Sequence, residues 1–215
     1  PRALRVPIGY VVELLAAVPS VIYGLWGLFI FRFWLLDYVE IPLSNYLGWI
    51  PIFSGTPFGL DVFTAGIILA IMIIPTIASV SREVISAVPT SIREAAYSIG
   101  ATKWEVIRHW VLSYARSGIF GAIILGLGRA VGETMAVTMV IGNATGPSAM
   151  PTSLFEPGQT LASLIANGFL EATSAIEQSA YIGAALALLI ISILINVLAY
   201  VMVTRVMKVK GGAVE

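Results

Sequence analysis

REAAYSIGAT, the stretch from Arg93 to Thr102, lies between two long apolar segments of this chain. Gly100 stands near its end, where a residue in the left-handed conformation often closes a helix. The pattern predicts two short helices, over about 92–99 and 103–112, that meet at Gly100. We expect an ordered pair of helices between apolar segments either to pack against the rest of the chain or to dock a partner protein.

Both predicted helices begin with the spacing of a capping box, a Ser or Thr three residues before a Glu. Ser91 and Glu94 fit the first box, and Thr102 and Glu105 fit the second. Each helix also carries an apolar face at helical spacing. The faces consist of Ile92, Ala95, Ala96 and Ile99 in the first helix and of Trp104, Ile107 and Val111 in the second. In one interpretation these faces pack on the chain's own helix bundle, and Glu94 serves only as a cap. In the other, the hairpin docks a soluble subunit. The spacing alone does not decide between the two.

The composition identifies an integral membrane protein. Of the 215 residues, 58% are hydrophobic and 11% are charged, whereas a soluble domain carries about a quarter charged residues. The chain has no cysteine and one histidine, His109, so a metal site is not expected. It also lacks the Gly-rich loop that cradles nucleotide phosphates. We therefore expect no catalytic residue, metal or cofactor, and no nucleic-acid partner.

Four apolar segments have about the 20 residues that a membrane-spanning helix needs. They lie at about 14–31, 62–80, 117–142 and 180–204. Pro19 and Pro75 fall inside two of them. A proline within a span is tolerated where neighbouring helices satisfy the freed backbone groups. The segments therefore predict kinked helices of a bundle that contacts membrane lipid at its surface.

Lys and Arg gather in alternate loops, which predicts the orientation of the spans. The basic residues of these loops are Arg2, Arg5, Arg82, Arg93, Lys103, Arg108, Arg116, Arg205, Lys208 and Lys210. Segments 32–61 and 143–179 carry mainly acidic residues instead. We predict that both termini of this chain and the loop 81–116 are cytoplasmic, and that the two acidic segments are outer loops.

Arg129 and Glu133 are the two charges inside the predicted third span, and they stand four residues apart. That spacing puts them on one face of a helix, close enough to pair. Each charge costs roughly 2.5–3.5 kcal/mol at the bilayer centre. The pair would either fix the bundle or line a polar path. In such a path the Arg129 guanidinium binds a passing oxyanion, and Glu133 either holds Arg129 in place or weakens its binding of the anion.

Glu94, Ala95, Ala96 and then Gly100 resemble the EAA loop of ABC-importer permeases. In that family the loop forms the coupling helix that seats in a groove of the ATPase. The family pattern usually continues through Ile-x-Leu-Pro. Trp110 and Ser113 of this chain depart from it, which leaves open how the second helix ends. The resemblance favours docking and implies a coupling role for these four residues.

The run GRAVGETMAVTMVIGN, from Gly128 to Asn143, resembles the third-span signature of phosphate ABC-transporter permeases, the PstC-like half. Segments 16–27 and 64–75 resemble earlier spans of the same family. The resemblance implies an all-α, polytopic transmembrane helix bundle of a type I ABC importer (MetI-like), with residues 1–215 as a single permease domain. Family members have further spans upstream, so we expect that this chain lacks them.

The implied function is import of inorganic phosphate across the inner membrane, with Arg129 and Glu133 on the translocation path. The implied partners are ABC ATPase subunits, a second permease subunit and an extracytoplasmic phosphate-binding protein. Molybdate and sulfate permeases share part of the signature, so these oxyanions are alternatives. A channel or carrier that works without ATP would need no docking loop. If the chain were a structural membrane scaffold, substitution of Arg129 would harm stability only.

Overall fold

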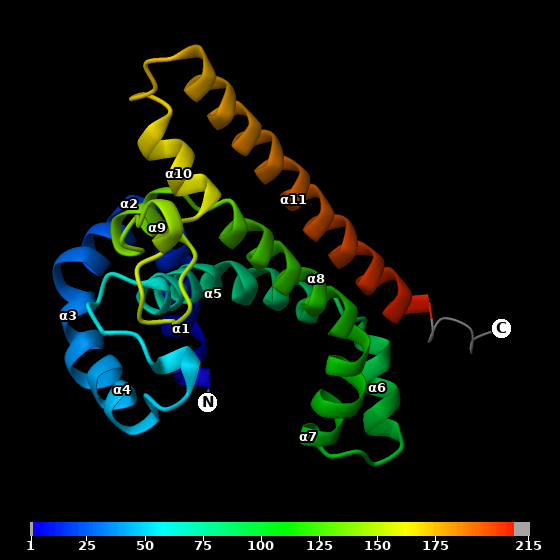
Figure 1. Ribbon diagram of the computed structural model, residues 1–215. Coiled ribbons are helices and arrows are strands. Elements are labelled where there is room, and N and C mark those ends of the chain that lie inside the picture. The colour runs from blue at the N-terminus through cyan, green and yellow to red at the C-terminus, as the bar shows by residue number, and fades with distance from the viewer. Residues whose placement is uncertain (1, 209–215) are drawn as a thin grey trace. The chain divides into compact units, whose positions relative to one another are not determined.

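The computed structural model describes residues 2–208; residues 1 and 209–215, Lys210 among them, lie outside the described part. The described residues form helices and loops without a β-strand, and an isolated bridge joins Gly142 to Gly158. The prediction of an all-α fold is confirmed (Figure 1). The bounds of the α-helices are α1 Arg2–Ala17, α2 Ser20–Trp26, α3 Arg32–Leu35, α4 Ile41–Leu47, α5 Val62–Ser86, α6 Thr90–Ser98, α7 Lys103–Glu105, α8 Leu112–Val131, α9 Met135–Val140, α10 Leu161–Gly168 and α11 Ala175–Lys208.

The chain divides into two compact units, and each is described by itself. The described parts of unit 1 are residues 2–16, 73–129 and 193–208, and unit 2 comprises residues 17–72 and 130–192. Both units are built from segments that are far apart in the sequence. That residues 1–215 act as a single permease domain stays a prediction.

Within residues 2–208, four helical runs are long and apolar enough to cross a membrane, as the sequence predicts. They are Ser20–Leu47, Val62–Ser86, Lys103–Val131 and Ala175–Leu198. The second and fourth lie close to the predicted 62–80 and 180–204. The first and third begin and end elsewhere than predicted, and both differences have a local cause.

The predicted first span, 14–31, contains a helix break. α1 ends at Ala17, and Pro19 precedes α2 with an extended backbone, φ −59° and ψ 141°. Proline lacks the N–H that would continue the first helix. The run from Ser20 then continues to Leu47 through π-helical turns at Gly27–Phe31 and Leu36–Glu40. Part of the predicted outer loop 32–61 is therefore helical.

The predicted third span, 117–142, begins and ends too late. The helical run starts at Lys103 and ends at Val131, after which residues 132–134 separate it from α9. Gly132 has little preference for a helix interior. The apolar pattern continues through α9, and for this reason hydropathy alone does not reveal the break.

A face of small residues on α8 lets this helix approach α5 closely within unit 1. The face includes Ala115, Gly118, Ala122 and Gly126, of which the two alanines are almost fully buried. A Cβ atom added to Gly118 would overlap Val84, and one added to Gly126 would lie 2.6 Å from the Ile77 Cγ1 atom. Small residues at such positions are typical of helix contacts in membranes.

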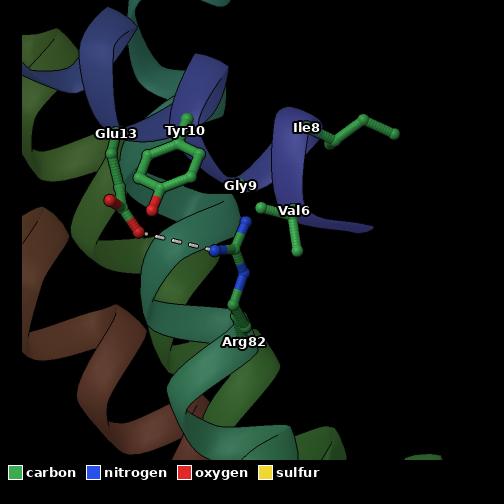
Figure 2. Close-up of a pocket in the computed structure, with 6 residues that line it drawn as sticks. All are labelled: Val6, Ile8, Gly9, Tyr10, Glu13 and Arg82. Atoms are coloured by element: carbon green, nitrogen blue, oxygen red, sulfur yellow. Dashed lines mark ion pairs between the residues drawn. The ribbon is translucent and has the colours of Figure 1, made fainter. Parts of the chain in front are cut away.

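Unit 1 also contains an ion pair near the start of the chain. The Arg82 Nη1 atom lies 3.6 Å from the Glu13 Oε1 atom, and both line an open pocket with Tyr10 and Gly9 (Figure 2). The two side chains are 47% and 64% exposed. Exposed pairs contribute little to stability. The pair links α1 to α5, and nothing in its geometry indicates a ligand site.

We expect Gly118→Ala and Gly126→Ala to destabilise the protein by about 1–3 kcal/mol, because each methyl group forces α5 and α8 apart. Gly121→Ala is the matched control, since a Cβ atom there has no neighbour within 4 Å. Thermal unfolding in detergent measures the difference. Equal midpoints for all three variants would contradict the close contact.

Candidate functional site

The stretch around Gly100 forms a helical hairpin, as predicted. α6 packs beside the π-helical turn at Val106–Val111, and this turn leads from α7 into α8 (Figure 1). Gly100 has φ +83°. Its N–H donates to the Tyr97 carbonyl at 2.9 Å, and the Ala101 N–H donates to the Ala96 carbonyl at 3.2 Å. These two bonds form a Schellman motif, which requires a left-handed residue at this position.

One of the two predicted capping boxes is present. The Thr102 N–H donates to Glu105 Oε2 at 2.7 Å, and the Glu105 N–H donates to Thr102 Oγ1 at 3.4 Å. The predicted cap at Ser91 is wrong. α6 begins at Thr90 with Pro89 before it, so Ser91 already lies in the first turn, and the start of α6 has no side-chain cap.

The inner face of the hairpin packs on its own bundle. Ala96 is 0% exposed and forms a buried cluster with Val88, Val106, Val111 and Ala115. The close packing predicted at Ala96 is therefore satisfied within the chain. For this residue the structure favours the packing interpretation over direct contact with a partner.

The predicted apolar faces are partly wrong. Ala95 is exposed, Ile99 is 72% exposed and Trp104 is 67% exposed, whereas Ala96 and Val111 point inward. The Schellman turn ends the helical register before Ile99, and the π-helical turn shifts the register after Trp104. Helical spacing counted along the sequence therefore fails at both positions.

We call six of the exposed residues of the hairpin its outer surface. Its members are Glu94, Ala95, Tyr97, Ile99, Gly100 and Trp104. Apolar side chains that form a contiguous exposed patch mark interaction sites. Helical spacing along the sequence puts Ile99 and Trp104 on apolar faces but does not distinguish inner from outer positions, and no motif singles out Tyr97.

Arg93 fastens the hairpin to α5. Its Nη2 atom donates to the Ile85 carbonyl at 3.0 Å, near the C-terminal end of that helix. A cation at this position also interacts favourably with the helix dipole. The outer surface is thus carried on a hairpin with two fixed attachments, the buried cluster around Ala96 and this hydrogen bond.

Arg129 is held by a residue that the sequence analysis missed. Its Nη1 atom donates to Thr76 Oγ1 at 3.0 Å, from α8 to α5. Thr76 directly follows Pro75, and a hydroxyl beside a proline within an apolar span is the signal that could have identified it. The Arg129 side chain is otherwise exposed in the described chain.

Glu133 lies beyond the end of α8, so the expectation that it shares a helical face with Arg129 is wrong. Its Oε1 atom accepts the Ala136 N–H at 3.1 Å. This bond satisfies one of the free N–H groups at the start of α9. Because the Glu133 carboxylate stabilises the start of α9, it favours a new helix over continuation of α8. Arg129 and Glu133 therefore each bond within their own unit.

Residues 1–208 match the family of the "Binding-protein-dependent transport system inner membrane component". The chain belongs to this family. Relatives of this inner-membrane component include the phosphate transport system permease protein PstC of Haemophilus influenzae, 46% identical over 215 residues, and that of Pasteurella multocida, 47% identical over 215 residues. PstC 2 of Mycobacterium tuberculosis is 45% identical over 200 residues.

These alignments cover 98%, 98% and 91% of this chain, in the same order, and 67%, 66% and 61% of the relatives. The chain therefore spans about two thirds of the length of the curated relatives that it matches. No solved structure gave a significant match. Family membership and the four apolar helices identify a multi-pass membrane protein of a transport system.

We expect Thr102→Ala to weaken the start of α7 by about 1 kcal/mol, the typical cost of a lost N-cap. Ser91→Ala is the control, because the start of α6 has no side-chain cap. Hydrogen exchange of the hairpin amides measures the loss of protection. The assignment of the caps fails if the two variants exchange alike.

Proposed function

We propose that the chain is a permease subunit of an ABC importer that carries inorganic phosphate across the cytoplasmic membrane. The observation that carries this proposal is the 46–47% identity to proteins named as phosphate transport permeases over nearly the whole chain. Those names favour phosphate over molybdate and sulfate. ATP is hydrolysed on separate ATPase subunits in this proposal, and an external binding protein delivers the anion.

The outer surface of the hairpin is the proposed docking site for the ATPase. Exposed Ile99 and Trp104 supply apolar area, and Glu94 adds a charge. Ala95 and Gly100 have little or no side chain, so a partner can approach the backbone closely. Ala96 contributes to coupling indirectly, because it anchors the hairpin from inside. The topology that fits this proposal places the hairpin and both termini in the cytoplasm.

Arg129 and Glu133 are the proposed residues of the translocation path, which would be completed by a second permease subunit. One N–H of the Arg129 guanidinium donates to Thr76. The guanidinium has several further N–H donors, whose geometry matches an oxyanion. Thr76 thereby fixes the direction of the guanidinium without neutralising its charge. The negative charge of Glu133 would keep the path from holding an anion too tightly.

We expect Arg129→Gln to lower phosphate uptake by the reconstituted, complete transporter at least about tenfold, because hydrogen bonds to charged groups contribute about 1.5–3 kcal/mol. Thr76→Val should lower uptake less, and Thr76→Ser should restore it. Assembly with the ATPase is measured in parallel and should not change. Normal uptake by Arg129→Gln would leave Arg129 as a packing residue.

Glu133→Gln separates charge from capping, because the Gln side-chain oxygen can still accept the Ala136 N–H. Changed uptake with an intact assembly would support a role of the negative charge. If the wild-type transporter moves no phosphate, uptake of molybdate and sulfate is the next measurement. Transport of either of these anions alone would overturn the proposed cargo.

We expect Trp104→Glu to abolish co-purification of the ATPase, because a buried aromatic residue at an interface often contributes about 2 kcal/mol or more. Trp49→Glu is the matched control, since Trp49 is 80% exposed and lies in a predicted outer loop. Retention of the ATPase by Trp104→Glu would contradict docking at this surface. A channel or carrier that works without ATP would then become the better proposal.

A further inference from the structure

Unit 2 contains a buried acidic cluster that the proposed transport function does not use. Glu40 lies at the end of the π-helical turn before α4, Asp61 directly precedes α5, and Thr64 lies in the first turn of α5. All three side chains belong to residues that are 0% exposed. Fully buried carboxyl groups are rare unless something compensates their charge.

Hydrogen bonds account for three of the four carboxyl oxygens. Thr64 Oγ1 donates to Glu40 Oε1 at 2.9 Å, and the Gly59 N–H donates to Glu40 Oε2 at 3.2 Å. The Thr64 N–H donates to Asp61 Oδ1 at 2.8 Å. Asp61 Oδ2 is buried and accepts no hydrogen bond from the described residues. A buried polar atom without a partner costs about 1–3 kcal/mol.

Thr64 joins the two carboxyl groups, because its Oγ1 donates to Glu40 Oε1 and its N–H donates to Asp61 Oδ1. The same residue thus holds both buried carboxyl groups in one cluster. Two carboxylates carry acceptors only, so a bond between them needs a proton on one of the two. The same arrangement would otherwise place two negative charges side by side in a buried site, which strongly disfavours double ionisation.

Neighbouring ionisable residues do not neutralise this pair. Asp37, on the same helical run, is exposed. The Arg32 Cζ atom lies 4.3 Å from the centre of the Phe33 ring, and Arg32 forms no ion pair among the described residues. Glu156 comes from the loop whose backbone bonds to the start of α5, and its own carboxylate accepts the Thr152 N–H at 2.7 Å.

We propose that Glu40 and Asp61 form a proton-binding site, in which one proton taken up from water is held between the two carboxyl groups at neutral pH. The proton is the donor that Asp61 Oδ2 otherwise lacks, and it reduces the charge of the cluster from −2 to −1. The bound proton fastens residues 59–61 and the start of α5 to the helical run 20–47. The site does not depend on which anion the transporter carries.

The proton makes the stability of unit 2 depend on pH. Burial raises the pKa of Asp61 above its ordinary value of 3.8. The folded chain therefore holds a proton that the unfolded chain releases, and stability falls as the pH rises. The contribution is complete below the pKa of the unfolded carboxyl group and is lost as the pH passes the raised pKa of the folded site.

Infrared spectroscopy of the complete, reconstituted transporter tests the site directly, because a protonated carboxyl group has a C=O band apart from the carboxylate bands. We expect the wild type to show this band at neutral pH and to lose it at high pH. Asp61→Asn should lack the band, since the amide N–H replaces the proton at the position of Oδ2. Asp37→Asn is the matched control and should retain the band.

Thermal unfolding against pH gives a second measurement. The wild type and Asp37→Asn should lose stability as the pH rises, whereas Asp61→Asn should change less, because an amide donates at every pH. Glu40→Gln serves the same comparison if Asp61→Asn fails to assemble. Absence of the band from the wild type at neutral pH, or its persistence in both amide variants, would overturn the proposal.

Discussion

The close contact between α5 and α8 is the interaction on which the candidate functional residues of unit 1 depend. It exists because Gly118 and Gly126 leave room for Val84 and Ile77. This contact fixes the register of the two helices, and the register brings Thr76 within 3.0 Å of Arg129. The hairpin follows from the same contact, since it connects the two helices at one end. The two glycines of α8 therefore position both Arg129 and the hairpin.

Side chains satisfy backbone polar groups locally at three helix starts of the described chain. Thr102 and Glu105 cap one helix start, Thr160 and Ser163 cap α10, and Glu133 supplies an acceptor at the start of α9. Where a helix start lies in an apolar span, no water replaces such a bond. A charged side chain in an apolar stretch, such as Glu133, can thus hydrogen-bond to the backbone. Any role of Glu133 in transport has to be compatible with its bond to the Ala136 N–H.

Local chemistry was better predicted from the sequence than register, although the predicted cap at Ser91 was wrong. The left-handed Gly100 and the Thr102 box follow from residue types that leave few alternatives. The break after Val131 was missed because α9 continues the apolar pattern. The exposure of Ile99 was missed because a turn resets the helical phase. The bond from Arg129 to Thr76 and the bond from Thr64 to Glu40 join segments distant in sequence, and no local pattern predicts which residues meet.

The Schellman turn at Gly100 has a mechanical consequence. A flexible loop would absorb a force applied at the tip of the hairpin by bending. Here the Ala101 N–H is bonded back to Ala96, and Ala96 sits in a packed cluster with Val106 and Val111. The tip therefore has low compliance. A displacement of the hairpin tip therefore moves α8 through the buried cluster and α5 through the Arg93 hydrogen bond.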